Sequence, residues 1–250
     1  MCRSIDLNCD LGEGVGDDEA LMPLITSANI ACGAHAGNEA VMRATVRLAR
    51  RHGVAVGAHP GFVDREHFGR RELVLSAAEI TTLVRAQVEA LQMIAKDEGV
   101  LITHVKPHGA LYNLAARDAG AAEAIAEAVA GVDANLWLYG LAGSELIKRG
   151  RARGLRVASE VFADRTYQAD GALTDRSRTD ALIKDEAAAI AQVLGMIREG
   201  RVRTIDGTEV AIVADTICLH GDAAGAVEFA RGVRAALDRE GVRLVNPAGA

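Results

Sequence analysis

The chain has 250 residues, of which 25% are charged and 50% are apolar, as in ordinary globular proteins. These fractions exclude a disordered chain, a collagen-like fibre and a disulfide-dense miniprotein. The net charge is -6, and only 3% of the residues are aromatic. Because duplex binding needs clustered cations and single strands need aromatic stacking surfaces, we expect no nucleic-acid partner.

The amino end and the cysteines both predict a cytoplasmic protein. Residues 1–6 hold no apolar signal region, and no apolar run approaches the roughly 18 residues of a membrane span. The cysteines lie far apart without a CxxC pair, which favours reduced thiols over a zinc ribbon. They are Cys2, Cys9, Cys32 and Cys218. We therefore expect a soluble chain with no membrane contact.

Short apolar or β-branched runs alternate along the chain with longer, Ala-rich amphipathic segments. The short runs predict strands at Ser4–Cys9, Ala28–Cys32, Val54–Ala58, Leu101–Lys106, Leu136–Tyr139, Arg156–Val161 and Thr216–His220. The longer segments predict helices at about 39–52, 76–98, 119–130, 142–152, 180–199 and 223–240. Boundary residues support these helices: a capping box at 76–79, N-caps at Asn38 and Asp222, and stops at Gly53, Gly99 and Gly241.

This alternation predicts right-handed βαβ units around a parallel sheet, in one domain over residues 1–250. A closed barrel and an open doubly wound sheet both satisfy it. Residues two apart on a strand share a face, so Asp6, Asn8 and Asp10 form one polar stripe. An open parallel sheet, covered on both faces, usually has continuous apolar strands. We therefore predict a seven-stranded β/α barrel.

Polar residues gather where the predicted strands end, the edge at which helix-covered parallel sheets place their active sites. They are Asn8, Asp10, His35, His59, Lys106, His108, Glu160, Asp164, His220 and Asp222. Any one histidine could be a structural core residue bonded to a carbonyl. Because scattered structural histidines would not choose the same end of several strands, the joint pattern indicates a functional cleft.

Two patterns in the sequence resemble a dinucleotide-binding motif and a metal-binding pair but do not meet the requirements of either. The stretch 12–16 follows a strand, but its third glycine is misplaced for a dinucleotide fingerprint and Asp17 and Asp18 would repel a pyrophosphate. No Walker-type sequence is present, so any nucleotide must be held in another way. His104 and His108 lie on extended chain beside Pro107, where four steps span about 13 Å, so they cannot share one ion.

Several roles stay open for the strand-end residues. Asp10, His59, His108 and His220 could bind zinc, iron or manganese. We predict instead an acid/base network without metal, because no tight ligand motif is present. Lys106 could stabilise an oxyanion, or be paired with Asp10 or Glu160. The Asp164-Arg165 pair could fix a substrate carboxylate, or be an exposed loop ion pair.

Six motifs, spread in order over nearly the whole chain, resemble the LamB/YcsF family. They are residues 6–14 (DLNCDLGEG), 29–37 (NIACGAHAG), 57–62 (GAHPGF), 105–113 (VKPHGALYN), 160–167 (EVFADRTY) and 218–222 (CLHGD). The resemblance implies a barrel of the glycoside hydrolase/deacetylase type. Because the family corresponds to the A subunit of bacterial 5-oxoprolinase, it also implies opening of 5-oxoproline to glutamate. That reaction uses ATP, with Mg²⁺, and partner subunits B and C.

For this reaction we predict a base at Asp10 or Glu160, orienting or acid/base groups at His59 and His108, and charge stabilisation by Lys106. Residues expected to bind or surround the substrate are Asn8, His35, Asp164, Arg165, His220 and Asp222, with Arg165 as the carboxylate anchor. One alternative is a metal-dependent deacetylase or amidohydrolase that acts alone without ATP. Another is a non-catalytic subunit that only delivers the substrate to its partners.

Overall fold

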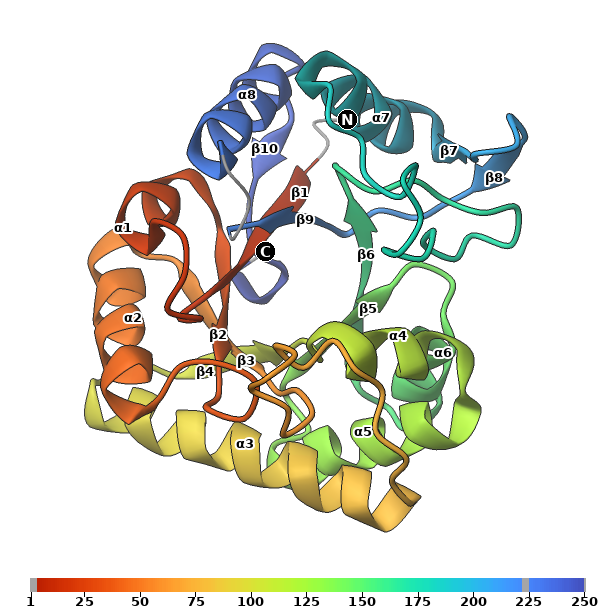
Figure 1. The fold of residues 1–250 in the computed structure, drawn as a ribbon. Helices are drawn as coiled ribbons and strands as arrows, with labels where there is room; N and C mark the ends of the chain where they lie inside the picture. Colours follow the sequence, from red (N-terminus) through yellow and green to blue (C-terminus); the bar gives the residue numbers. More distant parts are fainter. Residues whose placement is uncertain (1–3, 222–224, 250) are drawn as a thin grey trace.

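A closed barrel of parallel strands forms the centre of the molecule (Figure 1). The computed structural model describes residues 4–221 and 225–249. Within these residues, β1 pairs with β2 on one side and with β9 on the other, which confirms the predicted seven-stranded β/α barrel. The barrel strands are β1 (Ser4–Leu11), β2 (Ser27–Ala31), β3 (Ala55–His59), β4 (Ile102–Val105), β5 (Trp137–Leu141), β6 (Arg156–Phe162) and β9 (Thr216–His220).

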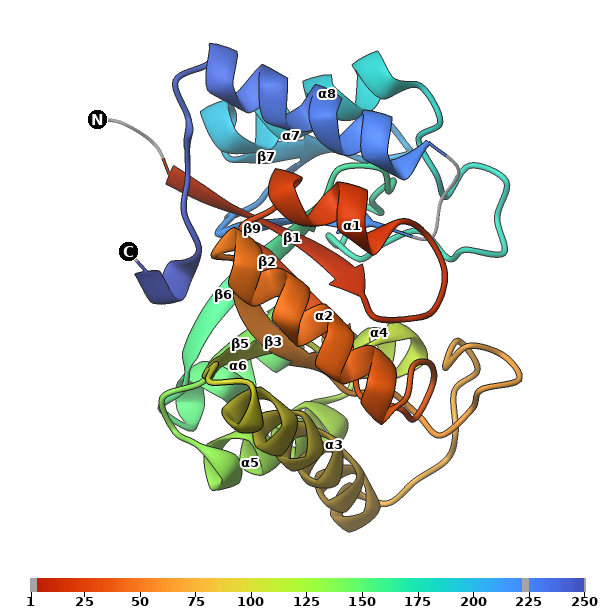
Figure 2. The same ribbon diagram turned by 90° about the vertical axis from the view of Figure 1, so that its left-hand side faces the viewer.

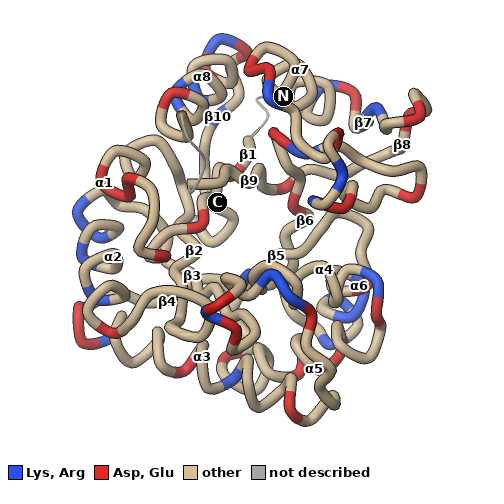
Figure 3. Tube along the Cα trace, in the orientation of Figure 1, with Lys and Arg blue, Asp and Glu red and all other residues tan. Residues whose placement is uncertain are grey.

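Helices surround the barrel and cover its outer face (Figure 1, Figure 2). They are α1 (Asp18–Leu21), α2 (Glu39–His52), α3 (Ala77–Asp97), α4 (Gly109–Arg117), α5 (Ala119–Val132), α6 (Glu145–Ala152), α7 (Glu186–Glu199) and α8 (Ala226–Arg239). Charged residues of both signs are interspersed along this outer ring (Figure 3). No helix in the described part of the chain is both long and apolar enough to cross a membrane.

Each of the six predicted helices is present, but three begin later than predicted. Ser144 and Asp185 cap α6 and α7 by accepting main-chain N–H groups three residues further on, which fixes where each helix starts. α8 starts after Gly225, and Asp222, expected as its N-cap, lies outside the described residues. The N-cap at Asn38 and the capping box at the start of α3 are confirmed.

Several short elements of the described chain were not predicted, and the helix α1 is one of them. The helix α4 follows β4 almost directly, where Pro107 and His108 indicated only extended chain. The hairpin β7 (Arg201–Arg203) and β8 (Glu209–Ala211) and the strand β10 (Arg243–Leu244) have two or three residues each, too few to show an alternating pattern. β10 pairs with the start of β1 and extends the sheet at that end.

The barrel interior is polar, as the side-chain parity of β1 predicts. The buried Asp6 carboxylate accepts hydrogen bonds from the hydroxyls of Thr26, Ser27, Thr216 and Tyr139, at 2.6, 2.7, 2.6 and 3.1 Å. Burial raises the pKa of Asp6 although these hydroxyl bonds act to lower it. The intervening residues of β1 are apolar and point to the helices.

His104 fills the middle of this interior. Its Nε2 lies 2.9 Å from Asn29 Oδ1, and its ring stacks on Tyr139 with centroids 4.4 Å apart. Gly57 lies opposite His104 on the neighbouring strand β3, and an added Cβ there would lie 2.1 Å from His104 Nε2. Glycine at this position is therefore required for the histidine to fit inside the barrel.

We expect Gly57→Ala to destabilise the fold by about 1–3 kcal/mol or more, because overpacking forces His104 and its partners from their positions. Urea unfolding followed by circular dichroism measures the change. Gly195→Ala on α7 is the control, since its added Cβ meets no atom within 4 Å. The control should gain up to about 1 kcal/mol from helix propensity. Equal stability of the two variants would contradict this account.

Glu98, the residue that ends α3, ties that helix to α2. Its carboxylate accepts hydrogen bonds from Arg43 at 2.9 Å and from Arg47 at 2.7 and 3.0 Å. Its main-chain carbonyl accepts another from Arg50 at 2.6 Å. Hydrogen bonds from Arg47 and Arg43 lower the pKa of Glu98 to about 2.

A carboxyl group that is more acidic in the folded chain than in the unfolded chain stabilises the fold above its unfolded pKa, about 4.3 for Glu. That contribution is lost as the pH falls toward the folded value. We therefore expect Glu98→Gln to lower Tm at pH 7 and to match the unmodified chain only at about pH 2 or below. Glu89→Gln, at an exposed position on the same helix, is the control. A Tm difference for Glu98→Gln that persists unchanged at acid pH would contradict this ion-pair account.

Candidate active site

A cavity of about 930 Å³ opens at the carboxyl ends of the barrel strands, the end that the sequence predicts. Polar side chains from β1, β3, β9 and the segments after β4 and β6 line it. The lining residues that bear on chemistry are Asp10, Glu13, His59, Lys106, His108, Arg165, Arg176 and His220. The site is therefore formed by residues distant in sequence and brought together by closure of the barrel.

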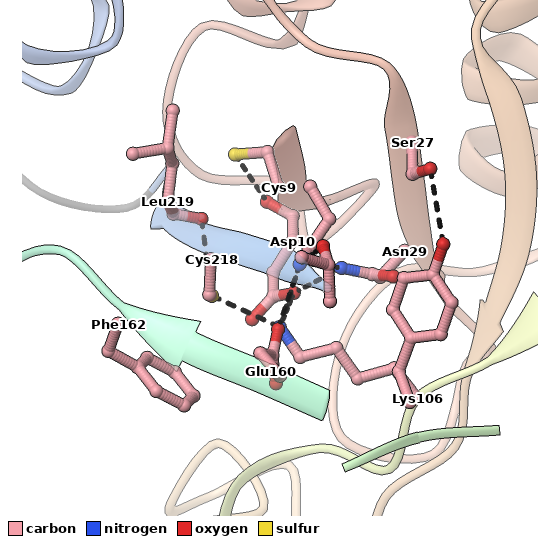
Figure 4. Close-up of polar contacts among 12 residues, drawn as sticks. Cys9, Asp10, Ser27, Asn29, Lys106, Glu160, Phe162, Cys218 and Leu219 are labelled. Carbon is pink, nitrogen blue, oxygen red and sulfur yellow. Dashed lines mark hydrogen bonds and ion pairs between the residues drawn. The ribbon is translucent and has the colours of Figure 1, made fainter. Parts of the chain in front are cut away.

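Lys106, which follows β4, lies at the floor of this cavity among four neighbours (Figure 4). Its Nζ is 2.8 Å from Asp10 Oδ1 and 2.8 Å from Glu160 Oε1, so one ammonium bridges two carboxylates. It also donates to Asn8 Oδ1 at 3.2 Å and contacts the Cys218 sulfur at 3.1 Å. Burial acts to lower the pKa of Lys106, but the adjacent anions outweigh it and hold that pKa well above its ordinary value.

The two carboxylates differ in their access to the cavity. The Asp10 side chain is 12% exposed and lines the cavity, whereas the Glu160 side chain is 0% exposed and lies behind Lys106. Burial acts to raise the pKa of Asp10, but His59 and Lys106 hold it well below its usual value. Asp10 is therefore an ionised carboxylate that a substrate or water can reach.

Three imidazoles and a carboxylate adjoin Asp10. His59 Nε2 lies 3.4 Å from Asp10 Oδ2 and 3.0 Å from His108 Nδ1. The His35 ring stacks on the His108 ring with centroids 3.8 Å apart. Burial is the main cause that lowers the pKa of His35 to about 3 and of His108 to about 2, so both rings are neutral at pH 7. Glu13 Oε1 lies 3.4 Å from His35 Nε2 and 3.5 Å from His108 Nδ1.

A second wall of the cavity carries guanidinium groups. The buried Arg165 donates to the carbonyl oxygens of Thr174 at 2.5 Å and Ala181 at 3.3 Å. Burial, with the nearby charge of Arg176, lowers the pKa of Arg165 to about 10. Arg176 also donates to His220 Nε2 at 2.8 Å. This wall is suited to bind an anion such as a carboxylate.

The structure separates the residues predicted for the site into two groups. Asn8, Asp10, His35, His59, Lys106, His108 and Glu160 lie in one continuous set of contacts. Asp164, Arg165 and His220 lie at the second wall, where Asp164 Oδ2 contacts His220 Nδ1 at 3.0 Å. The predicted alternative of an exposed Asp164-Arg165 loop ion pair is wrong, because Arg165 is buried. Asp222 lies outside the described residues.

Sequence reasoning missed Glu13, Asn29, Arg176 and Cys218. Glu13 lies in the glycine-rich stretch after β1, which was considered only for nucleotide binding. Asn29 donates to Asn8 and Asp10 at 2.7 and 2.8 Å, and the alternation along β2 could have shown it. Cys218 shares its strand face with His220, two residues on, which was a usable signal.

The glycine-rich stretch does not fit a nucleotide phosphate. The main-chain N–H of Gly12, which a phosphate would need, donates to the Asp18 carboxylate at 2.9 Å. Asp17 caps the helix that follows, and that helix is only four residues long. Carboxylates therefore already fill the place in which a phosphate loop binds its anion.

Known proteins resemble this chain over nearly its full length. The A subunit of a 5-oxoprolinase from Geobacillus kaustophilus is 59% identical over 249 residues, covering 98% of this chain and 97% of that protein. The crystal structure of a lactam utilization protein from Thermus thermophilus superposes with a TM-score of 0.91 at 46% identity, covering 97% of this chain and 99% of that one.

A more distant structure shows the fold alone. The peptidoglycan deacetylase PdaC from Bacillus subtilis superposes with a TM-score of 0.50 at 13% identity, over 98% of this chain and 88% of that one. The barrel type is therefore shared with deacetylases. The LamB/YcsF family matches residues 5–250. Because sequence and fold agree over nearly the full length, this chain belongs to the LamB/YcsF family.

Proposed function

We propose that this chain is the A subunit of an ATP-dependent 5-oxoprolinase and opens the lactam ring of 5-oxo-L-proline to give L-glutamate. The observation that carries the proposal is the pairing of the buried Lys106 ammonium with the accessible Asp10 carboxylate at the cavity floor. The names of the similar proteins, a lactam utilization protein and the A subunit of 5-oxoprolinase, support a hydrolase that acts on a cyclic amide.

Hydrolysis of the lactam forms one C–O bond to water and breaks the ring C–N bond. In our proposal Asp10 accepts a proton from the attacking water, and His59, 3.4 Å from Asp10, returns a proton to the ring nitrogen as it leaves. His108 orients His59. The Lys106 ammonium stabilises negative charge on the carbonyl oxygen.

The remaining predicted residues support these roles. We assign Glu160 and Asn8 the positioning of Lys106, which both contact, and Asp10 is therefore the base that we propose. The anchor for the substrate carboxylate is Arg165, with Arg176 beside it. His35, Asp164 and His220 lie around this site. His35 packs on His108. Asp164 contacts His220, which accepts a hydrogen bond from Arg176.

The proposal assigns ATP with Mg²⁺ to the assembled enzyme rather than to this chain. The glycine-rich stretch does not fit a phosphate, so we place nucleotide binding on the partner subunits B and C. Because ATP is supplied in the cytoplasm, the proposal also places the assembly there. In our proposal ATP phosphorylates the lactam oxygen and leaves as ADP, and we assign this chain the addition of water to the carbon activated in this way. The ring C–N bond then breaks, and a second water releases phosphate from the resulting acyl phosphate to give glutamate.

The first test is glutamate formation from 5-oxoproline and ATP, with the purified chain alone and with subunits B and C. We expect glutamate only from the complete mixture with Mg²⁺. Absence of glutamate from a complex shown by size-exclusion chromatography to be assembled would contradict the proposal. Turnover by this chain alone without ATP would instead support an amide hydrolase, the alternative that the cluster of Glu13 and imidazoles favours.

The second test replaces the cavity-floor charges. Asp10→Asn should lower kcat by about 10²–10⁴-fold, the contribution typical of a positioned general base. Lys106→Met alone would strand the buried Glu160 without its cation, which costs about 3–5 kcal/mol of stability. The double variant Lys106→Met with Glu160→Gln removes both charges and should fold but lose activity by about 10²-fold or more.

Lys148→Met is the matched control for these variants. Lys148 also lines the cavity, but its side chain is 63% exposed and pairs with Glu145 at the rim. We expect this variant to keep near-normal kcat. If Asp10→Asn and the Lys106 double variant were both as active as the unmodified chain, the chain would be a binding subunit that delivers the substrate.

A further inference from the structure

We propose that Glu13, His59 and His108 form a binding site for one divalent transition-metal ion of the zinc type. The ligand atoms of these residues and of His35 lie within 4.8 Å of one another at the cavity wall. Asp10 and His220, which the sequence also suggested as ligands, fall in a separate group with Cys218. The inference does not rest on the lactam chemistry proposed above, and an ion bound at His59 would take the place of the proton that this residue donates there.

The orientation of the two facing imidazoles carries the argument. His59 Nδ1 lies 2.7 Å from the carbonyl oxygen of Lys106, and His108 Nε2 lies 2.8 Å from that of Phe68. Because a carbonyl oxygen only accepts hydrogen bonds, each of these two ring nitrogens is the donor. The other nitrogens, His59 Nε2 and His108 Nδ1, therefore face each other at 3.0 Å.

Two ring nitrogens that face each other in this way need a positive centre between or beside them. That centre is either an added proton or a metal ion. Glu13 Oε1 adds a negative charge 3.5 Å from His108 Nδ1, which increases the attraction for a divalent cation over a single proton. The chain holds the Phe68 carbonyl in place with a left-handed backbone at φ 55°, unusual for a residue other than glycine.

The spacing of the ligand atoms suits zinc. Ligands about 2.0–2.1 Å from a tetrahedral ion are about 3.3 Å from one another. The separations of 3.0 Å between His59 and His108 and 3.5 Å between His108 and Glu13 lie on either side of this value. The carbonyl bonded to the second nitrogen of each imidazole is the usual partner of a metal-binding histidine.

His35 is excluded as a ligand by its orientation. Its ring is parallel to the His108 ring, with 2° between the planes. An imidazole lone pair lies in the ring plane, so one ion cannot lie in the planes of two parallel stacked rings. His35 instead supports His108, in space left by glycines: an added Cβ would lie 2.7 Å from His35 Nδ1 at Gly61 and 2.8 Å from His35 Cβ at Gly69.

The donor set selects the class of ion. Two imidazoles and a carboxylate suit Zn²⁺, whereas Mg²⁺ and Ca²⁺ prefer oxygen donors alone. Glu13, His59 and His108 all line the cavity, so an ion held by these three residues keeps a coordination position open toward the cavity. When bound there, the ion would supply a Lewis acid beside Asp10.

The test is binding of Zn²⁺ to the full chain after removal of metal with EDTA, without substrate or partner subunits. We expect one Zn²⁺ per chain by isothermal titration calorimetry. Co²⁺, bound at the same site, should give visible absorption without a thiolate charge-transfer band. Glu13→Gln and His108→Asn should each weaken Zn²⁺ binding by about 100-fold or more, beyond the loss usual for residues that only support ligands.

Two control variants locate the ion. His35→Asn should weaken binding by only about tenfold, the lower end of the range for residues that support a ligand, since His35 packs on His108. Cys218→Ser should leave the Kd unchanged, because Cys218 belongs to the other group of potential ligands. Circular dichroism confirms that each variant is folded. Absence of stoichiometric Zn²⁺ binding by the folded chain would overturn the proposal in favour of a shared proton, and loss of binding in Cys218→Ser would overturn the assignment of ligands.

Discussion

The buried ammonium of Lys106 controls the charge of the whole active end of the barrel. Glu160 is completely buried and Asp10 nearly so, and an ionised carboxylate at such depth is costly without a cation in contact. Lys106 contacts both carboxylates, and the amides of Asn8 and Asn29 donate to the same two oxygens, Glu160 Oε1 and Asp10 Oδ1. Asp10 also contacts His59, so the lysine is linked to the imidazole cluster through this one carboxylate.

Small residues at the exits of the strands determine how closely the functional side chains can approach. Gly57 admits His104 to the barrel interior, and Gly61 and Gly69 leave room for the stacked imidazoles above it. A single methyl group at any of these positions would displace a ring. The glycines of the motifs are therefore packing requirements of the site as much as turn residues.

Much of the fold followed from the sequence, because strand runs and helix caps are local signals. Each of the seven predicted strands is present, and the polar stripe of Asp6, Asn8 and Asp10 identified the barrel. Which of Asp10 and Glu160 is accessible from the cavity could not be predicted, since it depends on the depth of each side chain within the closed barrel. Glu13 was missed for a related reason: its contacts join a loop after β1 to histidines about 22 to 95 positions away.

The way in which Arg165 is held has a consequence for affinity. Two main-chain carbonyls of the segment that follows β6 fix its guanidinium before any ligand arrives. A flexible arginine would lose about 0.5–1.5 kcal/mol of side-chain freedom on binding an anion. Here that ordering takes place during folding, so the wall proposed to bind the substrate carboxylate is preorganised. The same carbonyls leave little freedom for the guanidinium to follow a ligand of another shape, so in this proposal the backbone determines the selectivity for small anions.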